Sequence, residues 1–382
     1  MSSRHFLLLC LTCLWLAWRQ ASPAATPLRL IDSAAALDVA GAQTSDPALA
    51  SDNGARISCA WISRRNARES VIYREHNGDQ WQTPSVFAGA AGTSLGTPFL
   101  FYDRLLQPHV IWRETDAQRM TRLIHASRQS NYWMVHGPLL APTSSRVADP
   151  SAIYDAYGQL HVTWREGNGS FWSIKAADAQ SSGTLKISIL SDEKTAGLNL
   201  YPTIMATPFP RIQWFAQNNG QFHLRESQLA ILQQRWQPVA TFQMEALPVN
   251  RLPFLFGSPH GGMNALWVDS FKGMERVFWG IGDAQTRGAG MPVDEAVSAP
   301  GSQPFGQYAD AGPLIAWRGE TDKGPVVCVR RQEAGLWGAT ITLDAPYATQ
   351  PRVVGRGNAA CVVWISDASD GGDGNIHAGF LQ

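Results

Sequence analysis

Length, composition and charge together narrow the class of protein. The chain has 382 residues, of which 16% are charged and 10% aromatic, and 15 of them are tryptophan. A chain with so many apolar and aromatic residues can bury a large core, which argues against intrinsic disorder. Lys plus Arg and Asp plus Glu both number 31. No net charge therefore attracts the protein to nucleic acid, and we expect no nucleic-acid partner.

The first 25 residues have the pattern of a secretory signal peptide. Arg4 and His5 precede an apolar run from Phe6 to Trp18, and Ser22 and Ala24 provide a small-residue cleavage site. As a helix this run would span roughly 20 Å, short of the hydrocarbon core of a bilayer at about 30 Å. We therefore expect no integral membrane span and a secreted or periplasmic protein. Whether the segment is cleaved or kept as an anchor stays open.

A tryptophan repeat runs through the rest of the chain. Seven Trp residues each close a short apolar run, at intervals of 51, 52, 50, 53, 50 and 47 residues: Trp61, Trp112, Trp164, Trp214, Trp267, Trp317 and Trp364. The apolar residue two positions before each Trp gives the alternation of a β-strand. A Pro precedes each Trp by 12 to 14 residues, where a strand can begin without the N–H that proline lacks. Four antiparallel strands in about 50 residues, repeated seven times, predict an all-β, seven-bladed β-propeller.

The ends of the chain are predicted to close the ring. We expect residues 26–382 to form one propeller domain, with blades beginning near residues 46, 97, 149, 201, 252, 303 and 350. The seventh repeat ends in its third strand, and the spacing of the other repeats places an apolar strand candidate at residues 28–32. This N-terminal segment is predicted to supply the fourth strand of the last blade and so to pair an open edge.

Three cysteines remain beyond the signal peptide, each in an apolar run: Cys59, Cys328 and Cys361. An odd number does not indicate a disulfide framework, and buried free thiols are the expectation. A bridge between Cys59 and Cys361 stays open as an alternative, because the first and last repeats should be neighbours in a closed ring.

The repeats resemble those of a known superfamily. Residues 150–166 (PSAIYDAYGQLHVTWRE) and 97–114 show a Pro, an apolar run, a turn and a second apolar run that ends in Trp. This pattern is similar to the sialidase-like superfamily with bacterial neuraminidase repeats, in repeat style and over roughly residues 46–382. The Asp box of those propellers is matched only in part by residues 76–81 (HNGDQW). The arginine triad of sialidases has no matching residues, so the resemblance implies the fold and not sialidase activity.

Ionisable residues follow the repeat tryptophans, in loops expected to share one rim of the propeller. The candidate ligand-binding residues there are Arg113, Arg165, Arg318 and Asp269. Arginine binds carboxylate and sulfate groups bidentately, so a carboxylated or sulfated sugar is a candidate ligand. The candidate general acids or bases are Glu114, Glu166 and Glu320. The alternative is that these side chains form ordinary ion pairs at solvated strand ends.

The sequence also contains candidate residues for sugar stacking and for metal binding. Trp133 and Trp337 are candidates for stacking on sugar rings, with core packing as the alternative. His109 and His161 stand at the same position of adjacent repeats, where packing is favoured over a metal site. We expect no cofactor other than a weak Ca²⁺ candidate in a Gly-rich loop, with turn formation as the alternative: Asp367, Asp370, Asp373 and Asn375.

Two functions compete. Without a recognisable catalytic constellation, the first is a non-catalytic propeller that binds a carbohydrate or a protein partner, as a lectin or an assembly scaffold. The second is a polysaccharide-active hydrolase or lyase, which rests on fold analogy. An enzyme requires one asymmetric pocket with titratable groups of shifted pKa, whereas a lectin requires similar clefts between several blades.

Overall fold

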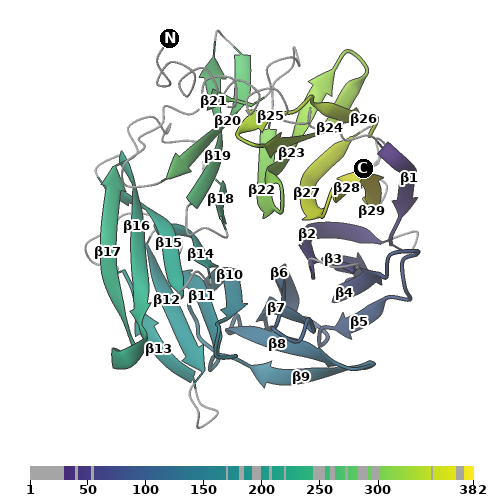
Figure 1. Cartoon of the computed structure of the whole chain (residues 1–382). Helices are drawn as coiled ribbons and strands as arrows, with labels where there is room; N and C mark the ends of the chain where they lie inside the picture. The colour runs from purple at the N-terminus through teal and green to yellow at the C-terminus, as the bar shows by residue number, and fades with distance from the viewer. Residues whose placement is uncertain are drawn as a thin grey trace, which may run out of the picture.

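The chain forms a ring of seven β-sheets in a computed structural model (Figure 1). The structure describes residues 30–38, 42–52, 56–168, 171–179, 185–191, 199–205, 209–218, 221–243, 254–258, 263–271, 274–282, 291–293, 302–345, 347–366 and 374–382. The predicted signal peptide lies outside these ranges. Within them, no helix is both long enough and apolar enough to cross a membrane.

Blades 1 to 4 each have four antiparallel strands in sequence order from the ring centre outward. Blade 1 contains β2 (Gln43–Ser51), β3 (Ile57–Arg65), β4 (Arg68–His76) and β5 (Ser85–Ala88). Blade 2 contains β6 (Ser94–Tyr102), β7 (Pro108–Thr115), β8 (Thr121–Gln129) and β9 (Tyr132–Pro138). Blade 3 contains β10 (Arg146–Tyr154), β11 (Leu160–Gly167), β12 (Trp172–Ala179) and β13 (Leu185–Ile189). Blade 4 contains β14 (Asn199–Met205), β15 (Arg211–Asn218), β16 (Gln221–Ala230), the 3₁₀ turn η1 (Ile231–Gln233) and β17 (Arg235–Gln243).

Blades 5 to 7 vary this plan at their outer edges. Blade 5 contains β18 (Phe254–Gly257), β19 (Met263–Phe271), β20 (Met274–Gly282) and the short β21 (Met291–Pro292). Blade 6 contains β22 (Ser302–Ala309), β23 (Gly312–Thr321) and β24 (Gly324–Glu333), whose outer edge pairs with both β25 (Leu336–Trp337) and β26 (Ile341–Leu343). Blade 7 contains β27 (Ala348–Arg356), β28 (Ala359–Ser366), β29 (Asn375–Leu381) and, as its outermost strand, β1 (Leu30–Ala36).

The N-terminal strand closes the ring, as predicted. β1 pairs antiparallel with β29, so the first and last described strands share one sheet. The strand occupies Leu30–Ala36, which shares residues 30–32 with the predicted range of 28–32 and continues to residue 36; residues 28 and 29 lie outside the described ranges. The backbone N–H of Leu37 donates to Ile376 O at 2.8 Å just beyond it, which extends the pairing at this edge.

The repeat tryptophans lie between blades. Seven clusters of buried side chains fill the seven junctions between adjacent blades, and each contains one of these tryptophans. All seven indole rings are 5% exposed or less. Truncating such a side chain to Ala typically costs about 3–5 kcal/mol, so this spacing reflects the core of the fold.

The innermost strands carry a bulge where a repeat proline stands. The preceding residue has a φ of 50–55° at Asp46, Asp149, Tyr201, Gln303 and Gln350. Pairing with the second strand shifts register at each of these positions. A β-bulge re-aims its side chain, and here the Gln350 side chain accepts a hydrogen bond from the backbone N–H of Asp46 in the next blade at 3.0 Å.

The three cysteines beyond the leader are free and buried. Cys59 and Cys361 belong to the same cluster between blades 7 and 1. The expected proximity of the first and last repeats is therefore present without a bridge, and buried thiols are confirmed.

Candidate functional site

The predicted arginines of blades 2 and 3 lie beside one partly buried carboxylate. Arg165 forms an ion pair with Asp149, and its guanidinium lies 5.6 Å from the ring centre of Tyr201 in blade 4. Arg113 of blade 2 adds a second positive charge near Asp149. Burial raises the pKa of Asp149 above its usual range, and the two arginines oppose this shift. Positive and negative charge therefore offset one another here.

The predicted glutamates of these blades also have partners. The Glu114 carboxylate lies 3.2 Å from Nη2 of Arg122, and the Glu166 carboxylate lies 2.9 Å from Nζ of Lys175. Both contacts fit the alternative of strand-end ion pairs. The other three predicted rim residues, Asp269, Arg318 and Glu320, belong to blades 5 and 6. The catalytic or binding role of the predicted rim residues stays a prediction.

The two tryptophan candidates pack against other rings. Trp133 meets Tyr73 edge-on, with ring centres 4.6 Å apart, and Trp337 meets Trp279 edge-on at 5.5 Å. These contacts match the packing alternative. Residues 367–373 of the calcium candidate lie outside the described ranges, and Asn375 begins β29. No group of three or more His, Cys, Asp or Glu suited to a metal occurs among the residues that are described.

A large groove opens between blades 2 and 3. Its volume is about 1080 Å³. Polar side chains line one part of it: Asp103, His109, His125, Ser127, His136 and Tyr154. Apolar side chains line the remainder, among them Leu139, Leu140, Leu185 and Ile187. The cavity thus combines an apolar wall with a compact set of titratable groups, as ligand sites commonly do.

Three adjacent strands of blade 2 place the histidines together. His109 on β7 stands opposite Ser127 on β8, and His125 precedes Ser127 by two residues, which puts both on one face of the strand. His136 is the extra residue of a bulge on β9, since His125 pairs with Gly137 and the next residue of β8 pairs with Val135. The bulge accounts for the direction of the His136 ring into the groove.

Short contacts connect these side chains. Nδ1 of His109 lies 2.9 Å from Nε2 of His125, and Nε2 of His109 lies 3.4 Å from a carboxylate oxygen of Asp103. The Ser127 hydroxyl lies 2.6 Å from Nε2 of His136. The rings of His125 and His136 stack at 4.8 Å. Asp103 and the three imidazoles therefore form one continuous array in the groove.

Burial sets the charge of this array. It lowers the pKa of His109 and His136, and it lowers the pKa of His125 to about 3. Burial also raises the pKa of Tyr154 to about 12, with a further contribution from the charge of Asp103. At neutral pH the groove therefore presents uncharged imidazoles, which can accept protons, beside a phenol that keeps its proton.

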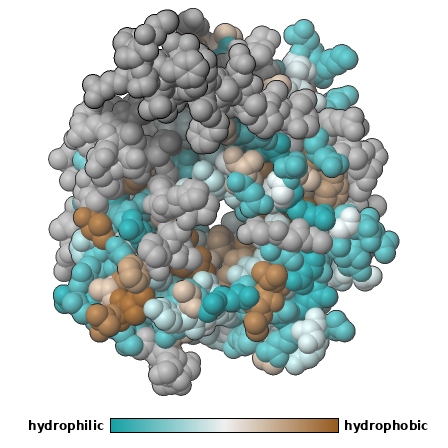
Figure 2. Space-filling model, viewed as in Figure 1, coloured by the Kyte–Doolittle hydropathy of each residue, from teal (hydrophilic) through white to brown (hydrophobic). Residues whose placement is uncertain are grey.

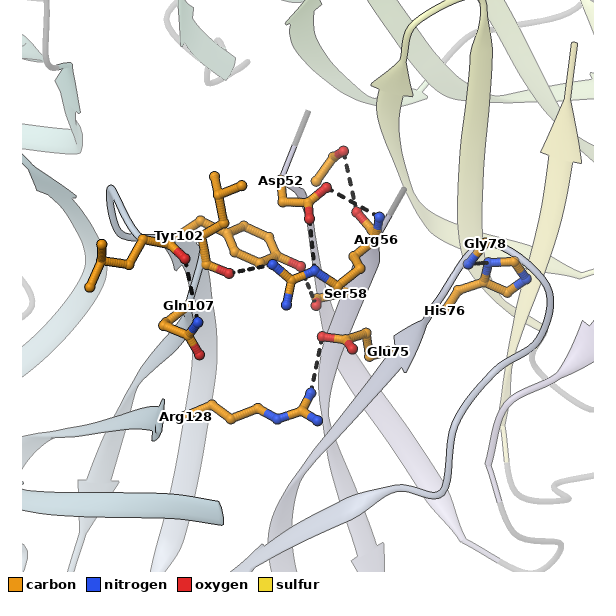
Figure 3. Close-up of polar contacts among 12 residues, drawn as sticks. Asp52, Arg56, Ser58, Glu75, His76, Gly78, Tyr102, Gln107 and Arg128 are labelled. Atoms are coloured by element: carbon orange, nitrogen blue, oxygen red, sulfur yellow. Dashed lines mark hydrogen bonds and ion pairs between the residues drawn. The ribbon is translucent and has the colours of Figure 1, made fainter. Parts of the chain in front are cut away.

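Related polar clusters occupy the neighbouring junctions. Between blades 1 and 2, Glu75 accepts a hydrogen bond from Arg128 at 3.1 Å, and Ser58 bonds to Tyr102 at 2.6 Å (Figure 3). Glu75 also accepts a hydrogen bond from Tyr73 at 2.9 Å. Arg128 therefore directs its guanidinium toward blade 1, although the residue borders the groove. Between blades 3 and 4, His161 takes the place that Ser58 and His109 have in their repeats.

Sequence reasoning noticed His109 and missed its partners. His125 and His136 carry no repeat signature, and His136 reaches the groove only through a bulge. The alternation of His125 and Ser127 in the third strand was the available signal, because residues two apart share a face.

Comparison with known proteins supports the fold. No protein-family model and no curated protein sequence matches the chain. A protein of unknown function from Dyadobacter fermentans has a similar structure, with a TM-score of 0.54 and 10% identity over 93% of this chain and 99% of that one. An ulvan lyase from a new polysaccharide lyase family, bound to GlcA–Rha3S saccharide, has a TM-score of 0.55 and 12% identity, over 89% of this chain and 94% of that one. A mutant of AofleA from Arthrobotrys oligospora has a TM-score of 0.50 and 14% identity, over 86% of this chain and 93% of that one. At these identities the likeness shows the propeller fold.

Proposed function

We propose that the groove between blades 2 and 3 binds an acidic polysaccharide and cleaves it by β-elimination. The observation that carries the proposal is the array of uncharged imidazoles beside the protonated phenol of Tyr154. The groove volume of about 1080 Å³ is sufficient for several sugar units, since sites for drug-sized ligands measure about 300–1,000 Å³.

The reaction needs a base and an acid on the two sides of one bond. His136 is the exposed member of the array, and its Nε2–H can donate to the Ser127 hydroxyl oxygen, which leaves a lone pair on Nδ1. This nitrogen takes the proton from the carbon next to the uronate carboxylate. The electron pair of that C–H bond forms the C=C double bond, and the glycosidic C–O bond at the next carbon breaks. Tyr154 gives its proton to the departing oxygen.

The composition of the groove favours elimination over hydrolysis. Glycoside hydrolysis normally uses two carboxyl groups, placed about 5–5.5 Å or about 6.5–9.5 Å apart. Asp103 is the single carboxylate among the described lining residues, and it lies against His109. The imidazoles and the phenol are suited to moving protons to and from carbon and oxygen.

The proposed substrate is a uronate-containing chain. The similar ulvan lyase holds a saccharide of glucuronic acid and sulfated rhamnose, and elimination requires a carboxylate to acidify the neighbouring C–H bond. Because Arg128 is bonded to Glu75, the side chains of Gln107, Gln129 and Ser130 are the donors in the groove lining proposed to hold this carboxylate. The signal-peptide pattern adds the proposal that the protein acts outside the cytoplasm.

Binding without turnover is the second candidate. Its supporting observation is that polar clusters recur between blades 1 and 2 (Figure 3), between blades 2 and 3, and between blades 3 and 4. Repeated clefts are what a lectin requires. The three clusters differ in composition, however, and only the middle one presents three uncharged imidazoles in a groove of this size within the described structure.

The test is to incubate the purified protein with uronate polysaccharides and follow the ultraviolet absorbance of the unsaturated product. His136→Gln and Tyr154→Phe should each lower kcat by about 100-fold to 10,000-fold, the usual contribution of acid–base catalysis. His377→Gln and Tyr347→Phe are matched controls, because both residues lie in or next to blade 7. Both controls should keep full activity.

Each other outcome has a definite meaning. Saccharide binding without product would favour the lectin-like candidate. Full activity in both groove variants with loss in Glu166→Gln would move the chemistry to the predicted rim. If neither binding nor product appeared, the expected protein partner would become the leading explanation.

A further inference from the structure

A second cavity lies next to the groove, between blades 3 and 4. Its volume is about 330 Å³, and Tyr157, Gln159, Ala179 and Gln234 are among its lining residues. Ala179 also lines the larger groove, as does Gly158 from the same hairpin as Tyr157. The two cavities are therefore neighbours, separated by the turn at residues 155–159.

This turn presents an exposed aromatic ring. Tyr157 is 71% exposed, although a large aromatic side chain normally gains by burial. A carboxylate oxygen of Asp155 accepts the backbone N–H groups of both Tyr157 and Gln159 at 2.8 Å. The other oxygen lies 3.3 Å from Nε2 of the buried His161. The turn is thus anchored to the core, so a ligand that stacks on this ring would meet a loop that is already ordered.

Polar groups with unused hydrogen-bonding capacity surround the ring. Gln159 and Gln234 are exposed, and their side-chain amides have no partner among the described residues. The Lys186 ammonium donates to the backbone carbonyl of Gln234, which puts a positive charge beside the cavity. Amides suit sugar hydroxyl groups, and a lysine suits carboxylate or sulfate. On the face shown in Figure 2, most of the described surface is hydrophilic, with separate apolar patches.

We infer that Tyr157 and the cavity beside it form an extension subsite, which binds further sugar units of the acidic polysaccharide held in the groove. This inference rests on the proposed function. The polysaccharide would cross the turn at residues 155–159, with its cleaved bond over blade 2 and its continuation over blades 3 and 4. The protein would then bind long chains more tightly than short ones.

The test uses fragments of glucuronic acid and sulfated rhamnose, fractionated by length. Affinities are measured by calorimetry in the His136→Gln background, so that no fragment is cleaved. Tyr157→Ala should weaken the binding of long fragments by about threefold to tenfold, the usual contribution of an aromatic contact. Binding of fragments that fill only the groove should not change. Tyr157→Trp should restore the preference for length.

Tyr347→Ala is the matched control, because Tyr347 is 50% exposed and stands next to blade 7. It should bind every fragment as the parent does, and thermal melts should show all variants folded. Equal loss for short and long fragments, or no loss at all in Tyr157→Ala, would overturn the subsite while the groove stands. If the parent neither binds nor cleaves any fragment, the proposed function itself fails.

Discussion

Nδ1 of His109 and Nε2 of His125 lie 2.9 Å apart in the space between blades 2 and 3. One nitrogen must donate and the other accept, so the contact is lost when both rings are protonated. Burial acts in the same direction by lowering the pKa of both rings, to about 3 for His125. The contact and the burial together hold the pair in its low-charge state.

The first prediction concerns stability in acid. The unfolded chain takes up protons on these histidines near pH 6.5, whereas the folded protein resists protonation of His125 down to about pH 3. Protonation therefore favours unfolding in this window, and the melting temperature should fall as pH decreases through it. The fall in melting temperature with decreasing pH should be smaller in His125→Gln. It should be unchanged in His223→Gln, a control outside the groove. Parallel pH curves for the two variants would contradict the assignment.

A second prediction concerns the pH dependence of catalysis. Burial lowers the pKa of His136 below its ordinary value near 6.5 and raises that of Tyr154 to about 12. Over a wide range of pH, His136 is therefore unprotonated and can act as the base, while Tyr154 keeps its proton and can act as the acid. We expect kcat/KM to rise through an apparent pKa below 6.5 and then to stay level through mildly alkaline pH. A bell-shaped profile with both limbs near neutrality would contradict these roles.

For the buried His161, between blades 3 and 4, we predict the opposite dependence of stability on pH. Burial alone would lower its pKa, but hydrogen bonds and charge from Asp178 and Asp155 raise it above the ordinary value. Its contribution to stability is thus complete below about pH 6.5 and is lost as pH rises through the folded pKa. His161→Gln should cost about 3–5 kcal/mol at mildly acidic pH, as expected for a broken buried ion pair. Urea unfolding should show a smaller cost at alkaline pH, and a pH-independent cost would be the contrary result.

The sequence predicted the ring more accurately than the site for a physical reason. Each repeat Trp fills the equivalent position in its own junction between two blades. The same packing requirement therefore recurs seven times and leaves a periodic signal in the sequence. The closing strand continues to Ala36, beyond the predicted end at residue 32, because apolarity marks a strand candidate while pairing with β29 decides how far it extends. No local property of residues 30–36 contains that information.

The groove lies at the junction of blades 2 and 3, and its residues follow no repeat in the sequence. Asp103, His109, His125 and His136 come from a turn and three strands, and a bulge supplies the direction of the last ring. The rim residues Arg165 and Glu166 were visible because they follow a repeat Trp. Position relative to the repeat predicts where a side chain lies, whereas the adjacent strands of the same blade supply the partners of Glu114, Arg165 and Glu166.

The buried cysteines supply a further prediction. Cys59 and Cys361 are both 0% exposed, and burial raises the pKa of each thiol. Since the thiolate is the reactive form, neither should react with a polar thiol reagent while the protein is folded. After denaturation, both thiols and the thiol of Cys328 should react with the reagent. The measurement is mass spectrometry of the denatured protein, alkylated without reductant. A peptide pair of Cys59 and Cys361 that is unalkylated and lighter by two hydrogens would show a disulfide and contradict the free thiols.

The last prediction tests closure by the N-terminal strand. Deleting residues 30–36 leaves the backbone groups of β29 without partners along the outer edge of blade 7. The exposed edge and the lost pairing should cost several kcal/mol, which lowers the melting temperature by roughly 5–10 °C at about 2–4 °C per kcal/mol for chains of 150–250 residues. A synthetic peptide of residues 30–38 should recover part of the loss at high concentration, because it binds the folded form alone. A scrambled peptide of the same composition is the control, since it lacks the register that pairs Ala35 with Ala378. An unchanged melting temperature after the deletion would show that blade 7 is stable without β1.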